Sequence, residues 1–230
     1  MKKVKVLVLG LDGANWDMIK PWIDDGSLPN LKKLVSESST AINTPCLPPV
    51  TYPNWRCYST GKNPGKLGVY RFDHIDCKNR TIEINNSRSF KSRDFWDILN
   101  DHGIRTGVIN MPGEYPPKTI DGFLIAGGPD TTVSEYRKSR MSGYTFPPEL
   151  GDYLHEKYDY SVHPNPYLCS KENGGRDVGE ILRIMKMRFD VALDLIETQN
   201  VDFLHLTLFY INNIQHYFGF HEYTRRAWML

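Results

Sequence analysis

The segment that follows a proline-rich loop contains a hydroxyl residue, an amide residue and the sequence signals of a helix start. Their spacing suits a site that binds an anion. Pro53 predicts the first turn of a helix over 53–60, and Gly61 can end that helix in a left-handed conformation. Thr51 then precedes a helix N-terminus, whose unpaired N–H groups and positive dipole end attract phosphate-like anions. Asn54, in the first turn, can donate a further hydrogen bond to the same anion. Taken alone, Thr51 is more simply interpreted as a helix cap.

A carboxylate near the start of the chain is a candidate metal ligand that would activate this threonine. A threonine hydroxyl is a poor nucleophile unless a base or a metal ion activates it. Residues 3–10 form a short, apolar, β-branched run that predicts a buried parallel strand, and Asp12 follows this run. Ligand sites of open α/β sheets lie at the carboxyl ends of such strands, and a carboxylate suits a divalent cation. By itself, Asp12 followed by Gly13 is more often an ordinary turn.

Three motifs follow one another along the first 70 residues. They are Gly-Leu-Asp-Gly at 10–13, Ser-Leu-Pro-Asn-Leu at 27–31, and Pro-Pro-Val-Thr-Tyr-Pro-Asn-Trp followed by Thr-Gly-Lys-Asn-Pro-Gly-Lys-Leu-Gly-Val within 48–69. In this order they resemble the type I phosphodiesterase/nucleotide pyrophosphatase family of the alkaline phosphatase superfamily. The resemblance implies that Thr51 is the nucleophile, that Asp12 binds a first metal ion, and that Asn54 helps to hold the phosphoryl oxygens.

The same resemblance implies a second metal site, with zinc as the expected ion in both. Relatives carry Asp-x-x-x-His where this chain has Asn-Asn-Ile-Gln-His at 212–216. His216 matches the pattern, and Asn212 stands where a carboxylate is expected. An amide oxygen can bind a cation but brings no negative charge, whereas two cations about 3.5–4 Å apart need carboxylates to offset their repulsion. The implied ligands are therefore Asp12, Thr51, Asn212 and His216, in a site that lacks one charge.

The whole pattern predicts an α/β fold with a mostly parallel central sheet flanked by helices, similar to that of alkaline phosphatase. Residues 1–230 are interpreted as one such domain whose C-terminal part, with the family's remaining metal ligands, is missing. Residues 129–175 are rich in Gly, Pro, Ser and Tyr. By resemblance to the family they are expected to form a cap or lid over the site, and a plain surface excursion is the alternative.

Hydrophobic periodicity and punctuating residues predict the individual elements. Helices are predicted after Asn15, from Pro29, and over 95–100, 147–157 and 176–199. Beyond residues 3–10, strands are predicted over 38–43, 81–84, 104–110, 122–128 and 202–209. Residues 73–78 are expected to form a turn, and His205 is expected to be a hydrogen-bonded core residue and not a metal ligand.

The composition is that of an ordinary globular protein, with 40% hydrophobic and 24% charged residues and a net charge of +1. The balanced charge gives no support to nucleic-acid binding, and the lack of an 18-residue apolar run argues against a membrane span. Cys46, Cys57, Cys77 and Cys169 form no Cys-x-x-Cys pair. Free thiols in a reducing compartment, and hence a cytoplasmic location, are expected. Apolar surface left by an incomplete sheet predicts self-association.

Two functions remain open. The first is a metal-dependent phosphodiesterase or pyrophosphatase for a phosphate-ester or nucleotide-like small molecule, in which Thr51 attacks phosphorus and water then hydrolyses the covalent intermediate. The sequence does not choose between monoester, diester, pyrophosphate and sulfate ester substrates. The second is an inactive or binding-only relative that keeps the anion pocket around Thr51 and Asn54. An unrelated dinucleotide-binding fold is disfavoured because no Gly-x-Gly-x-x-Gly follows the first strand.

Overall fold

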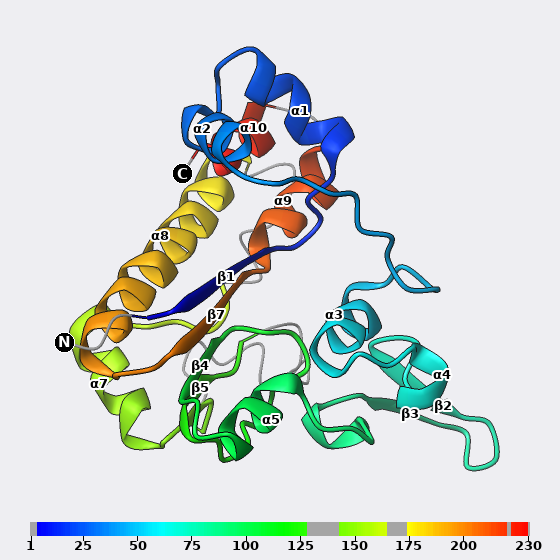
Figure 1. Cartoon of the computed structure of the whole chain (residues 1–230). Helices are drawn as coiled ribbons and strands as arrows, with labels where there is room; N and C mark the ends of the chain where they lie inside the picture. Colours follow the sequence, from blue (N-terminus) through cyan, green and yellow to red (C-terminus); the bar gives the residue numbers. More distant parts are fainter. Residues whose placement is uncertain (1–3, 128–142, 165–173, 220–221, 230) are drawn as a thin grey trace.

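The computed structural model of the chain describes residues 4–127, 143–164, 174–219 and 222–229, and is built around a five-stranded sheet (Figure 1). The strand order is β1-β7-β4-β5-β6, and every pairing is parallel except that of β6 with β5. The mostly parallel α/β fold predicted from the sequence is thus confirmed. The strands of this sheet are β1 (Val6–Leu11), β4 (Thr106–Ile109), β5 (Gly122–Ile125), β6 (Thr145–Phe146) and β7 (Phe203–Leu208).

Helices pack on both faces of the sheet. Successive side chains of a strand point to opposite faces, so Ile109 of β4 packs with α8 residues, whereas its neighbour Val108 packs with Trp96 of α5. The helices are α1 (Trp16–Asp24), α2 (Pro29–Glu37), α3 (Thr51–Thr60), α4 (Pro64–Leu67), η1 (Ser87–Ser89), α5 (Phe95–Asp101), α7 (Glu149–Tyr158), α8 (Gly174–Thr198), α9 (Tyr210–Phe218) and α10 (Glu222–Trp228). None of these helices, within the described ranges, is long and apolar enough to cross a bilayer.

Strand β1 lies at the edge of the described sheet, so the prediction that it is buried is wrong. It pairs with β7 on one side only. Its apolar side chains remain exposed, at 51% for Val6, 58% for Leu7 and 45% for Leu9. A continuous apolar run is typical of a parallel strand covered on both faces, but among the described residues nothing covers this one fully. Its second edge therefore leaves backbone N–H and C=O groups available for pairing.

Most local predictions agree with the structure to within a few residues. Asn15 caps α1, where its Oδ1 accepts the N–H of Met18 at 2.9 Å, and α2 begins at Pro29 as expected. The turn predicted over 73–78 is wrong in its first half, because β2 (Asp73–Asp76) pairs antiparallel with β3 (Thr81–Ile84). Three of the four residues of β2 are polar, so this strand lacks the apolar alternation that marks β3.

Residues 38–43 form no strand, contrary to the prediction. The segment is irregular, and Ile42 on it is 86% exposed. A strand needs a neighbour for its backbone hydrogen bonds, and none of the described strands lies beside this segment.

The predicted cap region is described only in part. Its middle portion, 143–164, adds β6 to the sheet and places α7 against α8. Leu150, Leu154 and Tyr160 of this portion belong to the main core cluster. The flanking portions, 128–142 and 165–173, lie outside the described residues, so a cap over the site stays a prediction.

Candidate active site

The end of β1 and the start of α3 bring Asp12 and Thr51 together, although 39 residues separate them in sequence. The Thr51 hydroxyl donates to Asp12 Oδ2 across 3.5 Å. The backbone N–H of Asp12 donates to the carbonyl of Leu208 at 3.3 Å, which ties the aspartate to the end of β7. Helix α3 begins at Thr51, two residues earlier than predicted, and ends as predicted at a left-handed Gly61. The two residues singled out first in the sequence therefore meet at the carboxyl edge of the sheet.

Trp55 is a third member of this cluster. Its indole Nε1–H donates to Asp12 Oδ1 at 2.8 Å. It lies one helical turn after Thr51, so both side chains share a face of α3. Gly10 makes room for the indole, since a Cβ at that position would stand 2.6 Å from the ring. Sequence reasoning missed this contact, although the i,i+4 spacing from Thr51 was a usable signal.

Asn212 contacts the same carboxylate from α9, the helix that follows β7. Its amide Nδ2 donates to Asp12 Oδ2 at 3.0 Å. A carboxylate only accepts hydrogen bonds when ionised, so the amide oxygen must face away from it. That oxygen lies over Gly13, 2.4 Å from where a Cβ would stand. Asn212 thus acts here as a donor to Asp12.

Burial dominates the electrostatics of Asp12, which is 6% exposed. Burial raises the pKa of this carboxyl above its usual value, and hydrogen bonds from Trp55, Asn212 and Thr51 offset part of the rise. The charge of His216 also acts to lower the pKa. His216 is itself exposed, one turn beyond Asn212 on α9. Within the described ranges, Asp12 has no ion-pair partner.

Asn54 is engaged on the other side of the loop. Its Oδ1 accepts the backbone N–H of Cys46 at 3.0 Å, and its own N–H donates to the carbonyl of Val50 at 3.0 Å. These bonds tie the proline-rich loop to the first turn of α3. Within the described residues, no hydrogen bond engages the two amide protons of the Asn54 side chain. Its role with phosphoryl oxygens stays a prediction.

The predicted ligands fit one divalent cation better than two. Asp12, Thr51 and Asn212 are brought together, and His216 stands nearby, so one carboxylate serves the whole cluster. No group of three or more His, Cys, Asp or Glu side chains gathers anywhere in the described part of the chain. A single carboxylate cannot offset the repulsion of two close dications. Among the described residues, the donor set thus supplies ligands for one hard cation, to which Asp12 and the Thr51 hydroxyl are suited.

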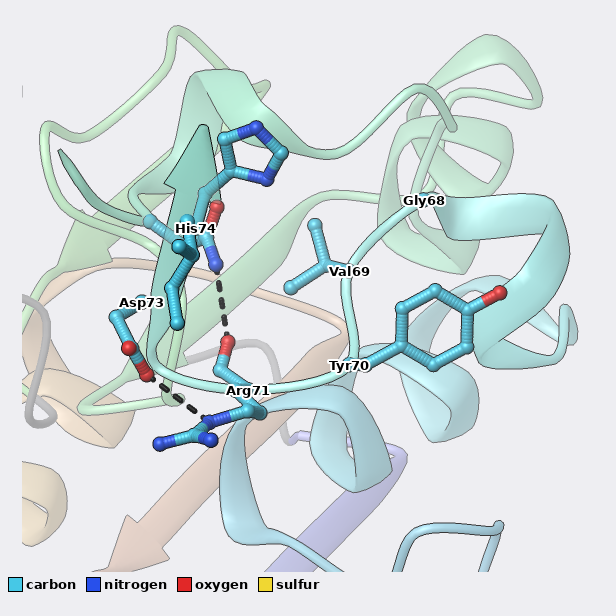
Figure 2. Close-up of a pocket in the computed structure, with 8 residues that line it drawn as sticks. Gly68, Val69, Tyr70, Arg71, Asp73 and His74 are labelled. Atoms are coloured by element: carbon cyan, nitrogen blue, oxygen red, sulfur yellow. Dashed lines mark hydrogen bonds and ion pairs between the residues drawn. The ribbon is translucent and has the colours of Figure 1, made fainter. Parts of the chain in front are cut away.

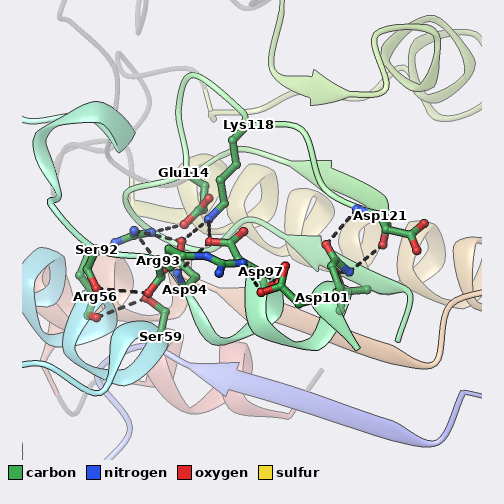
Figure 3. A network of polar contacts seen from close by, with 12 residues as sticks. Arg56, Ser59, Ser92, Arg93, Asp94, Asp97, Asp101, Glu114, Lys118 and Asp121 are labelled. Atoms are coloured by element: carbon green, nitrogen blue, oxygen red, sulfur yellow. Dashed lines mark hydrogen bonds and ion pairs between the residues drawn. The ribbon is translucent and has the colours of Figure 1, made fainter. Parts of the chain in front are cut away.

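A buried ion network holds the opposite face of α3 (Figure 3). Arg56 is 2% exposed and pairs with Asp94 at 3.0 Å and with Glu114. Lys118 joins Asp94 at 2.5 Å and Asp97 at 2.6 Å. Asp94 is the N-cap of α5, so the network links α3 to α5 and to the loop after β4. It fixes the helix that carries Thr51.

A hollow of about 200 Å³ lies beside the β2–β3 hairpin (Figure 2). Its polar groups are largely satisfied, because the Arg71 guanidinium pairs with Asp73 at 3.2 Å and the Arg71 carbonyl accepts the side-chain amide N–H of Asn85 at 3.0 Å. It is lined by Gly68, Val69, Tyr70, Arg71, Asp73, His74, Ile75 and Asn85. None of the predicted site residues borders it.

Solved structures share this fold. Phosphonoacetate hydrolase from Sinorhizobium meliloti 1021, in complex with phosphonoformate, matches with a TM-score of 0.68 and 16% identity. That match covers 99% of this chain and 51% of the hydrolase. Murine ectonucleotide pyrophosphatase/phosphodiesterase 5 matches with a TM-score of 0.51 and 15% identity, over 98% of this chain and 48% of its own. The chain thus spans about half the length of these structures.

Sequence comparisons give one further result. A search of curated protein sequences finds no match. The family profile named type I phosphodiesterase/nucleotide pyrophosphatase matches residues 6–228, which is nearly the whole chain. The chain therefore belongs to the type I phosphodiesterase/nucleotide pyrophosphatase family.

Proposed function

We propose that this chain forms the nucleophile-bearing part of a metal-dependent phosphoryl-ester hydrolase, with Thr51 as the attacking residue. The observation that carries the proposal is the contact of Thr51 with Asp12 at the N-terminus of α3. That end of a helix favours an anion through its unpaired N–H groups and its dipole. Family membership and the fold shared with a hydrolase support the same chemistry.

Residues of this chain can activate the Thr51 hydroxyl for attack. Thr51 already donates its hydroxyl hydrogen bond to Asp12, so the carboxylate stands where the proton must go. In the cation-free chain, burial raises the pKa of Asp12, so this carboxylate is a better proton acceptor than an exposed one. Trp55 and Asn212 hold it in place through their hydrogen bonds. A divalent cation held by Asp12 and Thr51 would lower the pKa of the hydroxyl further.

Hydrolysis of an aryl phosphodiester in the presence of Mn²⁺ or Zn²⁺ tests this proposal. Thr51→Ala should reduce the rate by about 10³-fold or more, since it removes the nucleophile. Thr51→Ser, which keeps a hydroxyl, should retain measurable turnover. Thr60→Ala on the same helix, whose hydroxyl donates to the Arg56 carbonyl and accepts the backbone N–H of Lys62, is the matched control. Equal rates for the wild type and Thr51→Ala would refute the proposed nucleophile.

A binding-only role is the second candidate, and the contact of Asn212 with Asp12 favours it. The amide N–H satisfies the buried carboxylate without a cation, where a second carboxylate would repel it. Such a protein would bind AMP or inorganic phosphate at Thr51 and Asn54 with no turnover. Calorimetric AMP binding that is lost in Thr51→Ala, together with no hydrolysis by the wild type, would decide for this role.

The proposed ligand is a phosphate-ester or nucleotide-like small molecule, bound with a divalent cation that we propose to be zinc. Solved relatives were crystallised with phosphonoacetate and with AMP, both of which are small anions with a phosphorus centre. We also propose a cytoplasmic location. Cys46, Cys57 and Cys77 are free thiols in the structure, which suits a reducing compartment.

We further propose that the chain self-associates through the exposed edge of β1. Beside the exposed apolar side chains of this strand runs a groove of about 230 Å³, lined by Leu9, Leu31, Phe189 and Trp228 among others. Leu7→Lys should lower the association constant in sedimentation velocity, because a charge at a strand edge opposes pairing. Leu34→Lys on α2, another exposed leucine, is the control. A wild type that sediments as a monomer at high concentration would refute association.

A further inference from the structure

Two cysteines flank the candidate site on the face of α3 that carries Asn54. Asn54 and Cys57 are three residues apart on the helix, so their side chains share a face. Cys46 lies on the proline-rich loop and donates its backbone N–H to the Asn54 side chain at 3.0 Å. The loop is thereby held against this face. We propose that Cys46 and Cys57 are a redox-active dithiol pair, which a small-molecule disulfide oxidises to an intramolecular disulfide.

The side chains of the two cysteines are neighbours in the reduced protein. Burial raises the pKa of the Cys57 thiol to about 12, and the neighbouring Cys46 side chain contributes to the rise. The Cys46 thiol also donates to the carbonyl of Pro48 at 3.3 Å, which keeps it on the inner side of the loop. Both cysteines are partly buried, whereas Cys77, which lies between β2 and β3, is exposed. The pair therefore differs from an isolated surface cysteine in having a partner within reach.

The reaction proceeds in two thiol–disulfide exchanges. The Cys46 thiolate attacks oxidised glutathione, so that a mixed disulfide forms and one glutathione thiolate leaves. The Cys57 thiolate then attacks the Cys46 sulfur, forms the intramolecular disulfide and releases the second glutathione. Two protein thiols are oxidised and one glutathione disulfide is reduced to two thiols, so atoms and electrons balance.

Oxidation would change the surroundings of the candidate phosphate ligand. The new bond would link the proline-rich loop directly to α3, on either side of the hydrogen bond between Cys46 and Asn54. The loop would then lose its freedom to move away from the first turn of the helix. The dithiol rests on the positions of the two cysteines and does not depend on the proposed hydrolase activity, so it can be tested without a substrate.

Peptide mapping of the full-length chain tests the pair directly. After incubation with oxidised glutathione, remaining thiols are alkylated and the protein is digested with trypsin. Cleavage after Arg56 separates Cys46, in peptide 34–56, from Cys57, in peptide 57–62. We expect these two peptides to appear crosslinked in the wild type and in Cys77→Ser, and to separate on reduction. Cys46→Ser and Cys57→Ser should instead carry glutathione on the remaining member of the pair.

The rate of crosslinking gives a second readout. Because the pKa of Cys57 is high, its thiolate fraction and hence ring closure should increase about tenfold per pH unit between pH 7 and 9. The proposal is overturned if wild-type Cys46 and Cys57 both end alkylated, or both end glutathionylated. Crosslinks of either residue to Cys77 or Cys169 in place of the expected pair would overturn it equally.

Discussion

Helix α3 has a cluster of buried polar contacts on each of two faces. The two clusters differ in how the buried charge is compensated. On one face, Arg56 is surrounded by carboxylates of Asp94 and Glu114, and Lys118 completes the network. On the other face, Asp12 is surrounded by neutral donors and has no cation paired with it in the described structure. Burial of a charge is costly unless an opposite charge compensates it. The charges of the first cluster are therefore compensated by opposite charges, whereas Asp12 in the second has only neutral hydrogen-bond donors against its carboxylate.

The pKa shifts follow this difference. Burial acts to lower the pKa of Arg56, but the nearby Glu114 and Asp94 reverse this effect and raise it. For Asp12, burial raises the pKa, and the neutral hydrogen-bond donors offset only part of the rise. Asp12 is therefore a buried carboxylate with a perturbed pKa at the carboxyl edge of the sheet, which makes it a candidate functional residue.

Breaking the cluster around Arg56 should have the largest effect. Arg56→Met leaves two carboxylates buried without their main cation, so the free energy of unfolding should fall by about 3–5 kcal/mol. Denaturant unfolding measures this loss. Arg71→Met removes an exposed ion pair with Asp73 and should cost about 0–1 kcal/mol. Similar losses for the two variants would contradict the structural role of the network.

His205 tests the contacts beneath α3. It is fully buried, 3.3 Å from the Tyr58 hydroxyl and 2.7 Å from that of Thr207, as expected for a core histidine. Burial lowers its pKa to about 4 from 6.5. Between these pH values the unfolded chain binds a proton that the folded chain does not, so stability should fall as the pH drops through this window, by on the order of 3 kcal/mol.

The control for this prediction is His205→Gln. Buried His163, whose pKa is lowered in the same direction, remains in that variant. The difference between the pH–stability curves of wild type and variant therefore isolates His205. A variant that loses stability between pH 6.5 and 4 as steeply as the wild type would show that His205 does not stay neutral in the fold.

Neutralising Asp12 should have the smallest effect on stability. Folding raises the pKa of Asp12 above its ordinary value of 3.8. The free energy of unfolding therefore falls as the pH rises from 3.8 through the pKa of the folded chain. Asp12→Asn removes this loss, so at pH 7 and without added metal the variant should be no more than about 0.5 kcal/mol less stable than wild type. Asp94→Asn, the same change in the cluster around Arg56, should cost about 3 kcal/mol or more. Equal losses of unfolding free energy in Asp12→Asn and Asp94→Asn would contradict the difference between the two clusters.

Sequence reasoning could place Asp12 and Thr51 together because both signals are local. A strand ending in Asp12 and a helix beginning near Thr51 each follow from neighbouring residues, and parallel strands collect their carboxyl ends at one edge. Trp55 was missed because an aromatic residue in a helix is normally assigned to the core. The bond from Asn212 to Asp12 spans 200 residues, and the direction of its amide depends on the tertiary fold.

The remaining errors have the same origin. β1 was predicted to be buried because its residues are apolar, but burial depends on the neighbours that the sheet order supplies. The partners of Arg56 lie 38 and 58 residues away in the sequence, so no local sequence pattern predicts that network. Cys46 and Cys57 form no recognised motif, and only the folding of the loop onto α3 brings them together.

Titration calorimetry with Mn²⁺ tests the central claim, that Asp12 is the one carboxylate of the described cluster and that Asn212 stands where a second carboxylate would strengthen cation binding. The wild type should bind at most one ion, and Asp12→Asn should abolish that binding. Asn212→Asp, which restores the second carboxylate, should bind Mn²⁺ at least tenfold more tightly, about 1.4 kcal/mol. A wild type that binds two ions with an affinity unchanged in Asn212→Asp would contradict the claim.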